Sequence, residues 1–379
     1  MQILRRVWAA VSSGVAADNR LAQLQSYNIW FDWLRFLAAL AVVLTHTRTR
    51  LFVEYSELEA SSRTIFTTLW YSLTRQGHEA VLVFFVLSGF LVGGPAIRRA
   101  LSKDFKPLDY ALDRCVRILV PLVPAIMLTG FVAAWIGLPM EVFNIAGTLL
   151  SLQGVVVPVP EANYALWSLS YEVWFYVLGG AIAYAISHRA GLALWPLLVM
   201  AVAIAVLSQL KILYTFIWFA GAAAFVFRSS IPRPVILIGG AVLAFLGTAT
   251  YQLTKPNTLI EDATAGIGFG IVAGEILLSI GVALFLSSLS SVRTRFDSNR
   301  IIRWGRPLAG FSYSLYLIHL PVLKLQPIVD WKEVTVTTFS YYLLTVFACL
   351  FAAFMFSRLF EMTGPSIKTM LRRTATGPT

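Results

Sequence analysis

An arginine and a histidine lie eleven residues apart within one apolar stretch of this chain, at Arg35 and His46. At about 100° per residue this interval makes roughly three full helical turns, so a helix would place both side chains on one face, about 16 Å apart along its axis. A permanent cation and a titratable imidazole are costly in lipid, and they favour a polar cavity. The pair therefore indicates either chemistry or transport.

A carboxylate and a serine occupy another apolar stretch. Ser168 and Glu172 are four residues apart and share a helical face. An imidazole that removes a proton from a hydroxyl needs a partner that orients it and stabilises its charge, and a carboxylate serves this purpose. We predict that Glu172 orients His46. The alternative is that Glu172 only pairs with an arginine inside the membrane, which lowers the cost of insertion.

Two further groups of side chains could bind a ligand. Arg114 and Arg117 share a face at the start of an apolar stretch, where two guanidinium groups could hold a phosphate-rich ligand or anchor the chain to lipid head groups. His319 is a second histidine within an apolar stretch, with Tyr313 near its face. It could belong to the functional site or serve only as a structural hydrogen-bonding group.

Metal and disulfide chemistry have no support in the sequence. The few histidines and carboxylates show no ligand spacing, so we expect no metal. Cys115 and Cys349 are far apart in the chain and form neither a disulfide framework nor a metal motif.

Membrane helices are the elements that must position these residues. The chain of 379 residues is 58% hydrophobic and only 13% charged, and apolar runs long enough to cross a bilayer recur along it. We predict an all-α, polytopic membrane helix bundle of about ten transmembrane helices. The expected spans cover about 29–47, 78–97, 116–137, 164–187, 191–209, 211–228, 234–251, 264–288, 309–326 and 338–360.

Three parts follow from this pattern along the chain. We expect a cytoplasmic N-terminal arm over residues 1–28, a transmembrane domain over 29–362 and a cytoplasmic C-terminal tail over 363–379. No internal repeat is visible, so the inverted repeats common in secondary transporters find no support.

The distribution of charge indicates how the chain is oriented. The net charge of +11 would suggest a nucleic-acid partner for a soluble protein, but here the basic residues lie mostly in alternate loops, as the positive-inside rule requires. The loop 138–163 has no Lys or Arg, whereas the loop 48–77 is an exception that mixes four arginines with three glutamates. We predict no nucleic-acid partner, contact with membrane lipids, and both termini in the cytoplasm.

Taken together, these segments resemble the acyltransferase-3 family of integral-membrane O-acyltransferases, over about residues 28–362. The gap between Glu361 and Pro365 is longer than in the family's last motif. The matching motifs, in chain order, are Arg35 with His46, the segment Phe84–Val92, Arg114 with Arg117, Ser168 with Glu172, the segment Ser312–His319, and Phe360–Glu361 followed by Pro365.

The resemblance implies transfer of an acyl group, most often acetyl, to a hydroxyl of a carbohydrate or lipid-linked glycan, such as an exported polysaccharide. Acetyl-CoA or another short acyl-CoA in the cytoplasm would be the donor, its phosphates bound by Arg114 and Arg117, with Tyr313 and His319 also in the donor site. The protein would lie in the plasma membrane, the inner membrane of a bacterium. Some family members carry an extra C-terminal hydrolase-like domain; without it, we expect transfer to finish in the membrane core or on another protein.

In the implied reaction, His46 acts as general base and Glu172 orients it. Direct transfer is favoured over an acyl-histidine intermediate. Four side chains are unranked candidates for stabilising the oxyanion: Arg35, Ser168, Tyr313 and Trp167.

Two other functions remain open at this point. A transporter or flippase could use Arg35, His46 and Glu172 as a proton or substrate relay. A non-enzymatic subunit of a polysaccharide export complex would tolerate the loss of His46.

Overall fold

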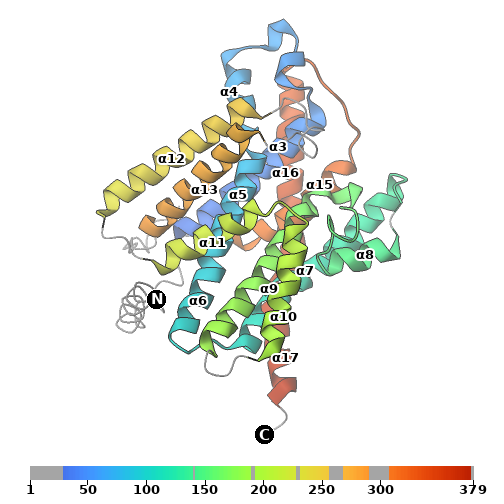
Figure 1. Cartoon of the computed structure of the whole chain (residues 1–379). Helices are drawn as coiled ribbons and strands as arrows, with labels where there is room; N and C mark the ends of the chain where they lie inside the picture. The colour runs from blue at the N-terminus through green and yellow to red at the C-terminus, as the bar shows by residue number, and fades with distance from the viewer. Residues whose placement is uncertain are drawn as a thin grey trace. The chain divides into compact units, whose positions relative to one another are not determined.

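The computed structural model describes residues 29–139, 141–188, 193–227, 231–255, 268–289 and 307–376, and these are helical apart from turns, loops and two isolated β-bridges (Figure 1). This confirms the predicted all-α class. The predicted N-terminal arm over 1–28 lies outside the described residues. The predicted C-terminal tail contains the helix α17, Gly364–Thr376.

Each of the predicted spans coincides with at least one helix. The longer helices are α3 (Ile29–Leu51), α4 (Ile65–Leu73), α5 (Gly77–Ser88), α6 (Gly94–Leu101), α7 (Pro107–Trp135), α8 (Val142–Leu149), α9 (Trp167–Ser187), α10 (Leu194–Ser208), α11 (Leu213–Val226), α12 (Arg233–Thr254), α13 (Phe269–Leu289), α15 (Ser312–Lys324) and α16 (Val336–Leu359). Shorter helical segments are η1 (Tyr55–Glu57), η2 (Ala60–Ser62), η3 (Gly89–Gly93), η4 (Glu161–Leu166) and η7 (Glu361–Thr363).

The helices have the lengths and composition of membrane spans. Within the described ranges, seven helical stretches are long and apolar enough to cross a membrane, and α10 and α11 are shorter apolar helices. The predicted span 309–326 corresponds to α15, which has 13 residues and contains Pro321. The protein is therefore an integral membrane protein with several membrane-spanning helices.

The chain divides into two compact units, each assembled from separate segments of the sequence. The first unit comprises Met1–Asp32, Leu82–Ala111 and Tyr171–Arg303, and the second comprises Trp33–Val81, Leu112–Ser170 and Trp304–Thr379.

Close helix packing in the first unit depends on small residues. A Cβ atom at Gly247 of α12 would overlap the backbone of Leu278 on α13, and one at Gly221 of α11 would overlap the carbonyl group of Val86 on α5. Glycines at such positions let the backbones of membrane helices approach each other, because helices in lipid associate through packing rather than through exclusion of water.

In the second unit, the loop predicted over 48–77 is folded into short helices against an aromatic cluster. The hydroxyl of Thr64 caps α4, where a capping box with Thr67 satisfies backbone donors of the first turn. The aromatic rings of Phe52, Trp70 and Tyr342 pack edge to face nearby. This loop is therefore tied to α16, and it follows directly on the end of α3 that carries His46.

Candidate active site

The two intramembrane histidines meet in the second unit. His46 lies on α3 and His319 on α15, and the Nδ1 atom of His46 is 2.9 Å from the Nε2 atom of His319. The two rings are nearly parallel, with an interplanar angle of 14°. His319 is fully buried, whereas His46 is partly exposed. His46 therefore keeps some accessible surface, while its partner is enclosed by protein.

The contacts of His319 determine which nitrogen of each ring carries a proton. The Nδ1 atom of His319 lies 3.0 Å from the carbonyl oxygen of Leu315 and 2.9 Å from that of Tyr316. Carbonyl oxygens only accept hydrogen bonds, so Nδ1 of His319 is protonated, and in the neutral ring Nε2 is an acceptor. Nδ1 of His46 must then donate to it. This arrangement leaves Nε2 of neutral His46 as an unprotonated, basic nitrogen.

Polar contacts hold α15 in place around His319. The hydroxyl of Tyr316 donates to the carbonyl oxygen of Ala165, so the hydroxyl of Ser168, 2.7 Å away, is the donor to Tyr316. The Nδ2 atom of Asn163, a buried residue of η4, donates to the carbonyl oxygen of Leu317 at 2.8 Å. The single hydroxyl proton of Ser168 is thus used to anchor α15, which leaves Ser168 poorly suited to donate to an oxyanion.

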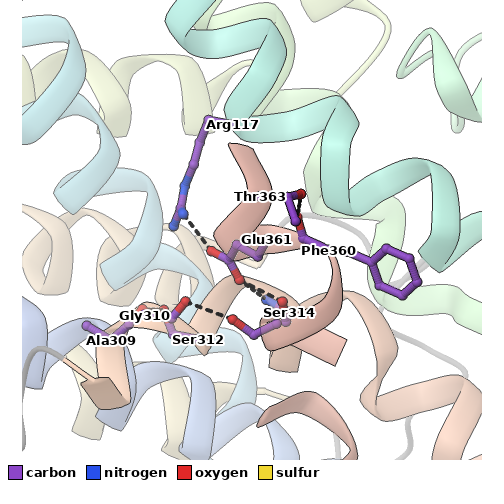
Figure 2. A network of polar contacts seen from close by, with 9 residues as sticks. Arg117, Ala309, Gly310, Ser312, Ser314, Phe360, Glu361 and Thr363 are labelled. Atoms are coloured by element: carbon purple, nitrogen blue, oxygen red, sulfur yellow. Dashed lines mark hydrogen bonds and ion pairs between the residues drawn. The ribbon is translucent and has the colours of Figure 1, made fainter. Parts of the chain in front are cut away.

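A second polar network joins α7 to the start of α15 (Figure 2). Nη1 of Arg117 lies 2.5 Å from Oε1 of Glu361. The other carboxylate oxygen of Glu361 accepts from the hydroxyl and the backbone N–H of Ser314, at 2.6 Å and 3.2 Å. The guanidinium carbon of Arg117 is 5.5 Å from the centre of the Tyr313 ring. The structure therefore brings together two of the predicted donor-site residues, Arg117 and Tyr313, and adds Glu361.

The remaining predicted cations lie on the same helices. Arg114 is half-buried on α7, one turn before Arg117, and Arg35 is half-buried on α3, eleven residues before His46. No group of three or more His, Cys, Asp and Glu side chains that could hold a metal ion occurs in the part of the chain that the structure describes.

Glu172 belongs to the first unit, where it ends a chain of hydrogen bonds. Nε1 of Trp218 donates to the hydroxyl of Ser88 at 3.1 Å, and that hydroxyl donates to Tyr176 at 3.2 Å. The hydroxyl of Tyr176 in turn donates to Glu172. Ser88 and Tyr176 each accept one of these bonds and donate the next, so a side-chain oxygen of Glu172 accepts the last one. Its predicted role as the partner of His46, which is in the other unit, stays a prediction.

A buried ion pair in the first unit was not among the predicted site residues. Nζ of Lys211 lies 2.7 Å from Oε2 of Glu275, and the hydroxyl of Tyr214 donates to Oε1 of Glu275 at 3.2 Å. The side chain of Glu275 is 1% exposed. The sequence could have indicated this pair, because Lys211 and Glu275 lie within the predicted spans 211–228 and 264–288 and ionisable residues are rare in lipid.

Comparison with known proteins identifies the family of the chain. A family model described as "Acyltransferase domain", that of the acyltransferase-3 family, matches residues 28–359. A protein described as "O-acetyl transferase" from Shigella phage Sf6 is 24% identical, over 77% of this chain and 84% of its own length. No solved structure matches the chain. The family match covers most of the chain and confirms the resemblance seen in the sequence: the protein belongs to the acyltransferase-3 family and is a membrane acyltransferase.

Proposed function

We propose that this protein is an O-acyltransferase that moves an acyl group, in the simplest case acetyl, from a cytoplasmic acyl-CoA to a hydroxyl of a cell-surface or exported carbohydrate. The observation that carries the proposal is the hydrogen-bonded pair of His46 and His319, because it leaves a basic nitrogen on the more accessible histidine. A general base at this position is what the transfer of an acyl group to a hydroxyl requires.

In the proposed reaction, Nε2 of His46 removes the proton of the acceptor hydroxyl as its oxygen attacks the thioester carbonyl. The carbon–sulfur bond then breaks, and the CoA thiolate leaves and takes up that proton. His46 becomes positively charged during the attack, so its hydrogen bond to His319 becomes charge-assisted and stronger. We assign His319, which the sequence placed among the donor-site residues, to this orienting role.

The donor site is proposed on the helices next to this pair. Arg117, with Arg114 one turn earlier, would bind the phosphates of the acyl-CoA, and the ring of Tyr313 would support the guanidinium of Arg117. Arg35 lies on α3 about 16 Å before His46 along the helix axis, on the side from which the donor would enter. From there its charge would attract the phosphates of the entering donor, and it is too far from His46 to contact the oxyanion.

The proposed acceptor of the acyl group and the proposed orientation of the chain in the membrane rest on different observations. The description of the phage relative as an O-acetyl transferase supports acetyl as the group transferred and oxygen as the acceptor atom, and the carbohydrate acceptor rests on the resemblance to the family. Both termini are placed in the cytoplasm because most of the Lys and Arg residues then lie in cytoplasmic loops.

The test compares CoA release by the purified protein in detergent, with acetyl-CoA and a pool of bacterial glycans, for the wild type and the His46→Ala variant. We expect release that depends on the glycans and falls to background in the variant. His188→Ala is the matched control, because His188 is exposed and its ring stacks on that of Tyr184 near the end of α9, away from His46 in the sequence. Release that is unchanged in His46→Ala would contradict the assignment of the base.

A further inference from the structure

We infer that Glu361 is a positioning residue that ties Arg117 to α15, the helix that carries His319. The inference rests on the proposed function, in which Arg117 binds the phosphates of the donor. Glu361 itself would contact neither the donor nor the acceptor. Its carboxylate would bind both Arg117, a residue of the proposed donor site, and the first turn of α15, the helix that carries His319.

The two oxygens of this carboxylate serve two different elements (Figure 2). Oε1 pairs with Nη1 of Arg117, and Oε2 accepts from the hydroxyl and the backbone N–H of Ser314. The side chain of Glu361 is 4% exposed in this pair, against 46% for Arg117. A buried carboxylate with both oxygens engaged is held in one orientation, and it fixes the groups that it binds.

The local fold explains why Glu361 is available at this place. The helix α16 ends at Leu359, and the turn η7 begins at Glu361 and is closed by a hydrogen bond from the hydroxyl of Thr363 to the carbonyl oxygen of Phe360. This turn brings the carboxylate to the first turn of α15, where the backbone N–H of Ser314 has no partner within its own helix. A negative charge at the start of a helix is also favourable for the helix dipole.

Arg117 keeps the capacity to bind an anion while it is held. Its guanidinium carries five N–H donors in a fixed planar arrangement, and its side chain is about half exposed. Glu361 and the ring of Tyr313 restrict where the guanidinium can lie. Because the Arg117 side chain is already restricted, it loses less conformational entropy when it binds a phosphate. Glu361 therefore favours donor binding even though it is an anion.

The same carboxylate acts on the helix of the histidine pair. His319 lies five residues after Ser314, which is about 7.5 Å along α15. A shift in the first turn of α15 would therefore move the partner of His46. Donor binding and the orientation of His46 therefore both depend on the carboxylate of Glu361.

Binding of coenzyme A to the detergent-solubilised protein, measured by calorimetry, tests the hold on Arg117. If only charge mattered, Glu361→Gln would bind coenzyme A more tightly, because an anion next to a phosphate site is lost. The positioning role predicts instead that Glu361→Gln binds coenzyme A about tenfold more weakly. Asp113→Asn is the charge-matched control. It removes one carboxylate from α7, four residues before Arg117, and Asp113 pairs with Lys368 instead. We expect Asp113→Asn to bind coenzyme A at least as tightly as the wild type.

A double variant separates this inference from the proposed donor site. We expect Arg117→Ala to weaken binding, and Glu361→Gln combined with Arg117→Ala to weaken it no further. Tighter binding in Glu361→Gln, or an additional loss in the double variant, would overturn the inference while leaving the donor site intact. Wild-type affinity in Arg117→Ala would instead show that the donor assignment is wrong, and the inference would fall with it.

A second variant tests the hold on α15. Ser314→Ala removes one bond from Glu361 and leaves the ion pair in place, so we expect a lower kcat for CoA release at unchanged affinity for coenzyme A. An unchanged kcat would refute this half of the inference. If Glu361→Gln does not yield folded protein, judged by its thermal unfolding, Glu361→Asp retains the charge on a shorter arm, and an intermediate loss of affinity is expected.

Discussion

Replacing His319 by two amides tests whether it selects the protonation state of His46. In His319→Asn, the side-chain amide can still donate to the carbonyl oxygens of Leu315 and Tyr316, but it is too short to reach His46. In His319→Gln, the longer side chain reaches the position of Nε2, and its carbonyl oxygen can accept from Nδ1 of His46. His319→Asn therefore loses the acceptor for Nδ1 of His46, whereas His319→Gln retains it.

The expected magnitude follows from the change in charge on His46 during the reaction. The bond between the rings measures 2.9 Å and joins two neutral groups in the ground state, where it contributes about 1 kcal/mol. With a positively charged His46 it contributes about 3 kcal/mol, the upper end for a charge-assisted bond. The difference of about 2 kcal/mol corresponds to a fall of about 30-fold in kcat for His319→Asn. For His319→Gln we expect a loss of no more than about fivefold, because the acceptor is retained.

The assay is the rate of CoA release at saturating acetyl-CoA and acceptor, with His46→Ala defining the background. Affinity for coenzyme A should be the same in both His319 variants, since the base and not the donor site is disturbed. Thermal unfolding in detergent identifies any variant that loses activity by loss of fold. Wild-type kcat in His319→Asn, or equal losses in the two variants, would refute the assignment of His319 as the residue that orients His46.

Two further predictions concern the stability of the first unit, and both are measured by thermal unfolding in detergent. Lys211→Met should destabilise the protein by about 3 kcal/mol, because it removes the cation of the ion pair from the buried carboxylate of Glu275. The addition of Glu275→Leu should recover most of that loss. An unchanged unfolding temperature in Lys211→Met would show that the pair is not needed. Gly221→Ala should lower the unfolding temperature, because its Cβ atom would overlap the carbonyl group of Val86. Gly239→Ala should raise the unfolding temperature through helix propensity, because no atom lies within 4 Å of its Cβ. Equal shifts in the two variants would contradict the packing argument.

The helical class and most of the helix positions could be predicted from the sequence, because membrane spans depend on local composition. A run of apolar residues such as 336–359 must form a helix in lipid, since its backbone groups have no other partners there. The helix α15 fitted this pattern less well, with only 13 residues where a longer span was predicted. Its ends depend on tertiary contacts, among them that of Glu361 with the first turn.

The candidate site was predictable as a set of residues but not as a set of pairs. Arg117 and His46 stood out because charged and titratable groups are rare inside apolar stretches. Helical spacing could relate residues only within one helix, so it grouped Arg114 with Arg117 and Ser168 with Glu172. It carried no information on which helices meet.

The sequence by itself therefore determined that this is a polytopic helical membrane protein, and its motifs in order identified the acyltransferase-3 family. Only the tertiary structure decided that His46 bonds with His319, 273 residues away, and that Arg117 pairs with Glu361, 244 residues away. The physical reason is the distance along the chain over which each kind of interaction acts. Hydrophobicity and helix geometry act over a few turns of one chain segment, whereas a hydrogen bond between helices depends on how whole segments pack, to within a fraction of an ångström.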